Sequence, residues 1–326
     1  MTMYTPTLQP AALKPAEDAE ALLKRLDWHV VRRLDGLLQG DYRSLFTGQG
    51  YDLAEVREYQ AEDDVRYMDW NVTARMDAPY VRQYIEDREI TAWLLLDLSP
   101  SVDFGTANSR KRDIVVDFAG VISRLLMRHG NKVGAMLFSN AVDEVLQPKN
   151  GQMHALRLLH QLVRTDHHEN GRHEAGKPGN ATDLAAILDR AARTLRRRAL
   201  VFVVSDFISQ SDWEPALGRL SQRNEVLAVW LTDPREEEIP DVGTLVLEDA
   251  ETGQQVYVDT RDKGFQERFQ QLVWDRRFNT ERAFARHGVD ALRLSTDGNM
   301  VREIARFAHL RRESRRRQRS RAGAMA

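Results

Sequence analysis

The sequence predicts an α/β protein with a doubly wound, mostly parallel sheet. From residue 90 onward, apolar strand-like runs alternate with amphipathic helical stretches, which is the pattern of a parallel sheet covered by helices. The first run, "ITAWLLLDL" at residues 90–98, shows no polar alternation, as expected for a strand buried on both faces. We therefore expect helices on both faces of one sheet.

The elements after residue 90 can be placed from their patterns. Ser109 can cap the first helix and Gly130 can end it. Residues 141–146 are a candidate antiparallel partner, and residues 244–259 predict a hairpin that turns at 251–253. The other expected strands are residues 90–98, 132–139, 199–206, 225–233 and 289–295. The expected helices are residues 109–130, 153–163, 182–195, 212–220, 262–287 and 299–312.

Four segments are predicted along the chain. Residues 1–18 are rich in Pro and Ala and are expected to form a flexible arm. Residues 19–89 begin with a helix, because apolar residues recur at every fourth position from Leu22 to Leu38, and continue as a small β-rich domain. Residues 90–310 form the α/β domain. Residues 311–326 form an Arg-rich tail that is expected to be solvated or disordered.

The composition excludes several kinds of site. The 326 residues include no cysteine, which excludes disulfides, thiolate metal ligands and cysteine nucleophiles. The net charge of −2 gives no indication of nucleic-acid binding by the body of the chain. No apolar run is long enough to cross a bilayer, and the first residues lack the pattern of a signal peptide. A cytoplasmic protein without a membrane span is expected.

Carboxylate and hydroxyl side chains gather where the predicted strands end. Asp97, Ser99 and Ser101 follow the first strand, and Asp206 ends the strand at 199–206. Thr182 lies at a loop-to-helix junction expected on the same edge. In an open α/β sheet, ligands bind beyond the carboxyl ends of the strands. All five side chains are hard oxygen donors, so the set predicts a site for Mg²⁺ or a similar divalent cation.

The order of these residues resembles the metal-ion-dependent adhesion site of von Willebrand factor A domains. That resemblance implies a Rossmann-like von Willebrand A fold, in which Ser99, Ser101 and Thr182 contact the metal. It implies that Asp97 and Asp206 hold the metal directly or through water, and that a partner's acidic side chain fills an open coordination position. A purely structural alternative also stands: the two serines start a turn and Thr182 caps its helix.

An N-terminal block, "REYQAEDDVRYMDWNVTAR" at residues 57–75, resembles the signature of the MoxR-associated, von Willebrand A-like family known as domain of unknown function fifty-eight. The family usually has Gly where this chain has Glu62. Membership implies a MoxR-type AAA+ ATPase as partner, with other von Willebrand A proteins as further candidates. The alternating charges themselves predict a salt-bridge network around a core of Tyr59 and Trp70. The matching positions are Arg57, Tyr59, Asp63, Asp64, Arg66, Met68, Asp69, Trp70, Ala74 and Arg75.

Two further polar segments are weaker candidates. The His-rich loop at residues 166–174 could bind Zn²⁺ or Ni²⁺, but its glycines favour a mobile loop. The acidic run from Glu236 to Glu238 follows another strand, which places it on the same edge as Asp97 in the expected topology, and it could help to select partners. Most charge runs, however, are simply solvated.

The predicted function is therefore non-enzymatic: a metal-dependent protein-interaction protein, acting as an adaptor for a MoxR-type AAA+ ATPase in complex assembly or maturation. A metal-dependent phosphoester hydrolase that uses the same rim is an alternative. Nucleic-acid binding through the Arg-rich tail is a third hypothesis, and it is not favoured. Phosphate-binding glycine loops and the Gly-x-Ser-x-Gly elbow do not occur in the sequence.

Overall fold

The computed structural model describes residue 34 and residues 56–60, 65, 68–76, 78–82, 90–107, 109–139, 141–169, 182–248 and 254–323. The predicted arm at residues 1–18 lies outside them, as does the predicted helix at 22–38 except for Leu34. Leu34 is helical and fully buried, and it belongs to the core of the α/β domain. The turn of the predicted hairpin, Glu62 and most of the His-rich segment also lie outside the described residues.

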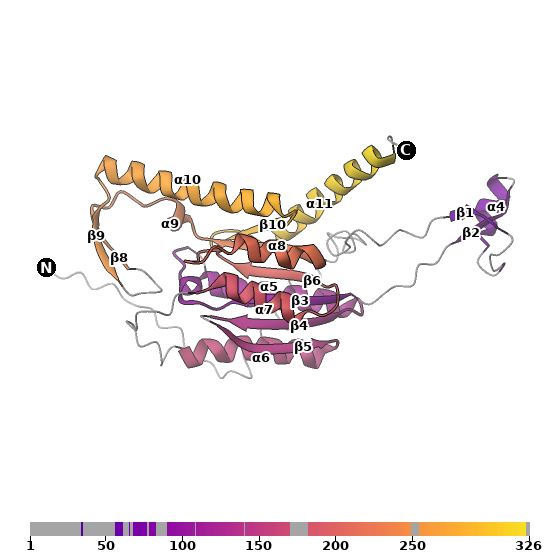
Figure 1. The fold of residues 1–326 in the computed structure, drawn as a ribbon, viewed down its shortest axis with the longest axis horizontal. Helices are drawn as coiled ribbons and strands as arrows, with labels where there is room; N and C mark the ends of the chain where they lie inside the picture. The colour runs from indigo at the N-terminus through magenta and orange to yellow at the C-terminus, as the bar shows by residue number, and fades with distance from the viewer. Residues whose placement is uncertain are drawn as a thin grey trace.

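A six-stranded sheet forms the centre of the molecule (Figure 1). Its order is β10-β7-β6-β3-β4-β5, and every pair is parallel except β4 with β5. The predicted mostly parallel sheet and its antiparallel partner strand are thus confirmed. The strands are β3 (Thr91–Asp97), β4 (Lys132–Phe138), β5 (Val142–Lys149), β6 (Leu200–Ser205), β7 (Glu225–Thr232) and β10 (Asp290–Ser295).

Helices pack on both faces of this sheet. One core contains side chains of α5 (Lys111–Arg128), α6 (Gln152–Glu169) and α11 (Met300–Gly323). The other contains side chains of α7 (Leu184–Thr194), α8 (Glu214–Arg223) and the end of α10 (Lys263–Arg286). Strand β3 serves both cores, because Leu94 and Leu96 belong to the first and Trp93 and Leu95 to the second. This explains the uninterrupted apolar run of β3.

The strand order reverses direction between β3 and β6. The chain leaves β3 through α5 to reach β4 on one side, whereas it leaves β6 through α8 to reach β7 on the other. The loops after β3 and β6 therefore diverge at the carboxyl edge of the sheet. Such a switch point is where open α/β sheets bind ligands.

A long insertion separates β7 from its parallel neighbour β10. It contains α9 (Pro234–Glu237), the antiparallel hairpin of β8 (Thr244–Glu248) and β9 (Gln255–Asp259), and α10. The predicted hairpin and the long helix after it are confirmed. Figure 1 shows the hairpin and the first part of α10 extending beyond the sheet.

Two helix boundaries differ from the sequence prediction. The N-cap position of helix α5 is Arg110 rather than Ser109, and the carboxylate of Asp113 in the first turn accepts from the Arg110 amide at 2.8 Å. The Ser109 hydroxyl instead donates to the carbonyl of Thr296. Helix α6 continues to Glu169, so the first part of the predicted His-rich loop is helical. Gly130 does end α5, with a φ of 83° that favours glycine.

The C-terminal helix is also longer than predicted. Helix α11 continues through Gly323, so most of the expected tail at residues 311–326 is helical. Arg311 is only 7% exposed and joins two carboxylates at the amino end of the sheet, Glu225 on β7 and Asp290 on β10, with both distances 2.6 Å. The predicted division at residue 311 therefore falls inside a packed helix.

The described part of the N-terminal block forms a small unit. Strands β1 (Val56–Glu58) and β2 (Tyr80–Arg82) pair antiparallel, and the intervening chain contains α4 (Trp70–Met76). The helix was not predicted. Asp69 caps it, because its carboxylate accepts from the amide of Val72 at 3.2 Å.

The expectation that Trp70 would be a core residue is wrong. Its side chain is 69% exposed, because it opens a helix that the sequence pattern did not predict. Tyr59 is half-buried. The side chains of Arg57, Asp63, Asp64 and Arg66, which the predicted salt-bridge network needs, lie outside the described residues. Among the helices of the described part of the chain, none has the length and apolar character needed to cross a membrane.

Candidate metal centre

The carboxylate of Asp97 lies at the end of β3, at the switch point of the sheet. One of its oxygens accepts from the amide of Ser99 at 3.0 Å, and the other accepts from the Ser205 hydroxyl at 2.6 Å. The side chain is only 1% exposed. Burial and then the charge of Asp206 raise the pKa of Asp97 to about 7, against the opposing effect of these hydrogen bonds. A proton or a nearby cation would therefore stabilise the Asp97 carboxyl group.

The two predicted serines lie side by side. Ser99 precedes the short 3₁₀ helix η3 (Pro100–Asp103), whose first turn contains Ser101, and the hydroxyl oxygens of the two serines are 3.1 Å apart. Magnesium holds its ligands at about 2.0–2.1 Å in octahedral geometry, which separates neighbouring ligand oxygens by roughly 3 Å. Both serines are buried. Their spacing fits two adjacent ligands of a small dication, and it is equally a hydrogen bond between hydroxyls.

Asp206 follows β6, the strand beside β3. One carboxylate oxygen accepts from the amide of Ile208 at 3.0 Å, and its backbone carbonyl accepts from the indole of Trp230 at 3.2 Å. The next residue, Phe207, has a φ of 57°, which is uncommon for a residue other than glycine. The Phe207 ring packs edge-on against Phe284 of α10, with the ring centroids 4.9 Å apart, so α10 helps to fix this turn.

Thr182 is brought to the same loop. It is 3% exposed, and its carbonyl accepts from the hydroxyl of Ser209 at 2.8 Å. The cap of α7 is Asp183 rather than Thr182, because the Asp183 carboxylate accepts from the amide of Ala186. The structure therefore places all five predicted residues at one edge, and it removes helix capping as the explanation for Thr182.

A buried lysine, which was not among the predicted site residues, completes this edge. Lys111 opens α5 and is fully buried. Its ammonium donates to Asp206 at 3.0 Å, to Glu236 of α9 at 2.6 Å and to the carbonyl of Ser101 at 3.4 Å. Burial lowers the pKa of Lys111, but the two carboxylates outweigh it and raise that pKa above its usual value.

Glu236 is the second carboxylate of this contact, and it belongs to the acidic run that was expected at the same edge as Asp97. Burial raises its pKa, the Lys111 ammonium opposes that effect, and the Asp206 charge adds to it. The predicted acidic run is thus not simply solvated, since Glu236 contacts Lys111 and Glu237 forms an ion pair with Arg293. The sequence contains one signal for these ion pairs, because Lys111 and Arg112 lie in the first turn of α5. Basic residues at that position oppose the helix dipole, so nearby acidic residues are expected. Arg112 shows the same pattern, paired with Asp103 at 3.3 Å.

Asp233 ties the loops of the edge together. Its buried carboxylate accepts from the amide and hydroxyl of Thr106 at 2.8 and 2.5 Å, from the hydroxyl of Thr296 at 2.6 Å and from the amide of Arg235 at 2.8 Å. Burial acts to raise the pKa of Asp233, but these hydrogen bonds lower it below its usual value. The loops that follow β3, β7 and β10 therefore share one anchor.

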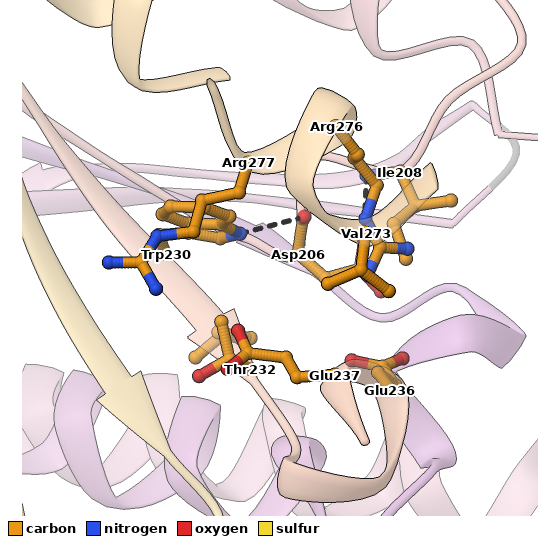
Figure 2. A pocket seen from close by; sticks show the side chains of 10 residues that line it. Asp206, Ile208, Trp230, Thr232, Glu236, Glu237, Val273, Arg276 and Arg277 are labelled. Carbon is orange, nitrogen blue, oxygen red and sulfur yellow. Dashed lines mark hydrogen bonds between the residues drawn. The ribbon is translucent and has the colours of Figure 1, made fainter. Parts of the chain in front are cut away.

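A small cavity opens beside Asp206 and Glu236 (Figure 2). Trp230 forms one wall, and Arg276 and Arg277 extend from α10 on the side opposite α9. The cavity places cationic groups of the inserted helix beside the carboxylates of the rim.

The donor set is suited to a hard cation. Within the ranges that the structure describes, no cluster of three or more His, Asp and Glu side chains could hold a metal ion. The predicted site does not depend on such a cluster, because it combines two carboxylates with three hydroxyls. Oxygen donors of this mixture are those that Mg²⁺ accepts, so the residues fit the implied ion.

These features define a mixed α/β protein with an acid-and-hydroxyl edge at its switch point. Residues 55–279 match the family described as "Protein of unknown function DUF58", and the chain belongs to that family. The "Uncharacterized protein Rv1480" of Mycobacterium tuberculosis is 38% identical over 292 residues, which cover 90% of this chain and 89% of that protein. "Uncharacterized protein Mb1516" of Mycobacterium bovis gives the same values. The family predicted from residues 57–75 is therefore confirmed.

Two solved structures align with part of this chain. The hypothetical protein BatB from Bacteroides thetaiotaomicron aligns with a TM-score of 0.42 and 14% identity, covering 69% of this chain and 99% of that chain. An aerotolerance-related membrane protein from Bacteroides fragilis aligns with a TM-score of 0.43 and 14% identity, covering 68% and 98%.

Proposed function

We propose that this chain is a non-enzymatic interaction protein of the von Willebrand A type, which binds an acidic side chain of a partner through a divalent cation. The observation that carries the proposal is the convergence of Asp97, Ser99, Ser101 and Asp206 at the switch point, with the serine hydroxyls 3.1 Å apart. Thr182 supports it from the adjoining loop. Mg²⁺, when bound by these residues, would supply the positive charge that an incoming carboxylate requires.

The residues of the chain would prepare this site in distinct ways. Ser205 and the amide of Ser99 orient the Asp97 carboxylate, and the amide of Ile208 orients Asp206. Burial removes competing water from both acids. These contacts orient the two carboxylates as ligands of a cation, and they assign no side chain the role of nucleophile or general acid. We therefore prefer a binding function to hydrolysis.

The proposed partner is a MoxR-type AAA+ ATPase, which the chain would serve as an adaptor in assembling or maturing other protein complexes. This part rests on the resemblance of residues 57–75 to the MoxR-associated family. Cytoplasmic action fits such a partner.

An affinity pull-down with and without Mg²⁺ tests both parts. We expect capture of the ATPase to need Mg²⁺ and to be lost in Asp97→Ala and Thr182→Val, which remove one carboxylate and one hydroxyl. Asp183→Asn is the matched control, because it changes the neighbouring residue while keeping a good helix cap. Capture that resists a chelator and survives both substitutions would refute the proposal. Turnover of p-nitrophenyl phosphate that is lost in the same variants would favour the hydrolase instead.

A further inference from the structure

The Lys111 ammonium uses its full hydrogen-bonding capacity inside the candidate metal centre. An ammonium has three donors, and Lys111 has three acceptors within 3.4 Å: the Asp206 carboxylate, the Glu236 carboxylate and the carbonyl of Ser101. The side chain is fully buried. It is therefore a fixed positive charge whose position is set by three different segments of the rim.

This charge shares Asp206 with any metal ion that the site binds. One Asp206 oxygen accepts from Ile208, and the other accepts from Lys111 at 3.0 Å. A dication that uses Asp206, directly or through water, would lie close to the ammonium. Like charges in a buried site repel strongly, because little solvent screens them.

The repulsion between Lys111 and the metal ion affects the net charge that an incoming ligand would meet. Asp97, Asp206 and Glu236 together carry −3 when ionised, and Lys111 brings the set to −2. A dication would then make the set neutral. Without Lys111, the metal-loaded set would keep −1 and would repel an incoming carboxylate. Arg276 also acts on Glu236, but it is exposed and therefore screened by solvent.

We propose that Lys111 is a resident cation of this site, which weakens metal binding and strengthens the capture of an anionic ligand once metal is bound. The inference rests on the proposed function, because it needs a metal at Asp97 and Asp206. It assigns Lys111 a role in specificity: the loaded site accepts a carboxylate that a purely acidic site would repel. A purely structural lysine would not shift the two affinities in opposite directions.

The first arm of the test measures Mn²⁺ binding by electron paramagnetic resonance. Lys111→Met removes the charge and keeps an unbranched side chain. We expect Mn²⁺ to bind about tenfold more tightly or better to this variant than to the wild type, given the size of a Coulomb interaction at such distances. Equal or weaker binding by folded Lys111→Met would overturn the inference.

The second arm measures an anion at saturating Mn²⁺. Acetate is the probe, and its replacement of Mn²⁺-bound water is followed by water-proton relaxation. We expect acetate to bind several-fold more weakly to Lys111→Met than to the wild type. Unchanged or tighter acetate binding would overturn the part of the inference that concerns ligands.

Arg311→Met is the matched control, because Arg311 is also a buried cation between two carboxylates but lies at the amino end of the sheet. It should leave both affinities unchanged. If Lys111→Met does not fold, Glu236→Gln is measured instead. Among the described residues it leaves Asp206 as the carboxylate that accepts from Lys111, so Mn²⁺ should bind more weakly, and equal or tighter binding contradicts the inference. If the wild type and every variant fail to bind Mn²⁺, the proposed function and the inference are both refuted. If the wild type binds Mn²⁺ but the expected changes in Mn²⁺ and acetate affinity are missing, the inference alone is refuted.

Discussion

The two ends of the central sheet hold the same ionic arrangement in different surroundings. At the amino end, Arg311 joins Glu225 and Asp290, and the Asp290 side chain is 50% exposed. At the carboxyl end, Lys111 joins Asp206 and Glu236, whose side chains are 1% and 19% exposed. Solvent can screen the surplus negative charge at the amino end. The carboxyl end also contains Asp97, so its surplus is larger and buried, and only a proton or a cation can offset it.

The largest expected effect on stability comes from removing the buried cation at each end of the sheet. Lys111→Ala should lower the free energy of unfolding by about 3–5 kcal/mol, since it leaves buried carboxylates without their cation. Arg311→Ala should cost about 1–2 kcal/mol, because Asp290 can return to water. Urea unfolding of both variants, without added divalent cation, measures the difference. An Arg311→Ala cost equal to or above that of Lys111→Ala would show that burial does not separate the two ends.

The pH dependence of stability sharpens the comparison, because the carboxyl end contains Asp97, whose pKa is raised to about 7 by burial and by the charge of Asp206. The folded protein keeps the Asp97 proton up to about pH 7, whereas the unfolded chain releases it near 3.8. The folded state therefore binds more protons between these values, and stability falls as pH rises, by up to about 1.4 kcal/mol per pH unit for this group.

Asp97→Asn should remove that slope, and the control Asp290→Asn at the amino end should keep it. The measurement is urea unfolding of the three proteins at several pH values between about 4 and about 7 without divalent cation. Parallel curves for wild type and Asp97→Asn would mean that Asp97 is not the acid responsible.

A smaller effect is expected from weakening the loop contacts at the carboxyl end while Lys111 and the side chains that accept from it are kept. The amides of Thr106 and Arg235 donate to different oxygens of Asp233, and Asp233→Asn turns one of those oxygens into an NH₂ group, so one amide loses its acceptor at a cost of about 1–3 kcal/mol. Hydrogen exchange should rise in residues 104–107 and 233–237 and stay unchanged at the start of β7. Asp183→Asn, at an exposed helix cap, should change little. Uniform exchange in Asp233→Asn would contradict the role of Asp233 as a local anchor.

The edge residues could be predicted because strand ends are visible in the sequence. Asp97 and Asp206 each end an apolar run, and parallel strands bring their carboxyl ends to one edge. Lys111 could not be placed in the same way, since its partners Asp206 and Glu236 are 95 and 125 residues away. Only the three-dimensional course of α9 brings Glu236 to the site.

The errors of prediction have local causes. Trp70 was expected to be buried because aromatic residues usually are, but Asp69 caps a short helix and leaves Trp70 at its exposed start. Ser109 has the chemistry of a helix cap, yet its hydroxyl contacts Thr296, a residue in a distant loop. In both cases the usual preference of the residue type, burial for Trp and helix capping for Ser, is overridden by a neighbouring residue or a distant contact. The burial of Arg311 was not predicted, because its partners lie on two strands that its own sequence does not indicate.

The insertion between β7 and β10 has a consequence for the order of folding. Strands β6 and β7 are joined through residues 206–224, whereas β7 and β10 are joined through residues 233–289. Closing the longer loop costs more chain entropy before any pairing rewards it, so we expect β10 to dock after β6 and β7 have paired. Until then, β7 presents an open edge to other chains. Arg311 forms ion pairs with the first residue of each strand, Glu225 of β7 and Asp290 of β10, so both pairs can be present only after β10 has docked beside β7.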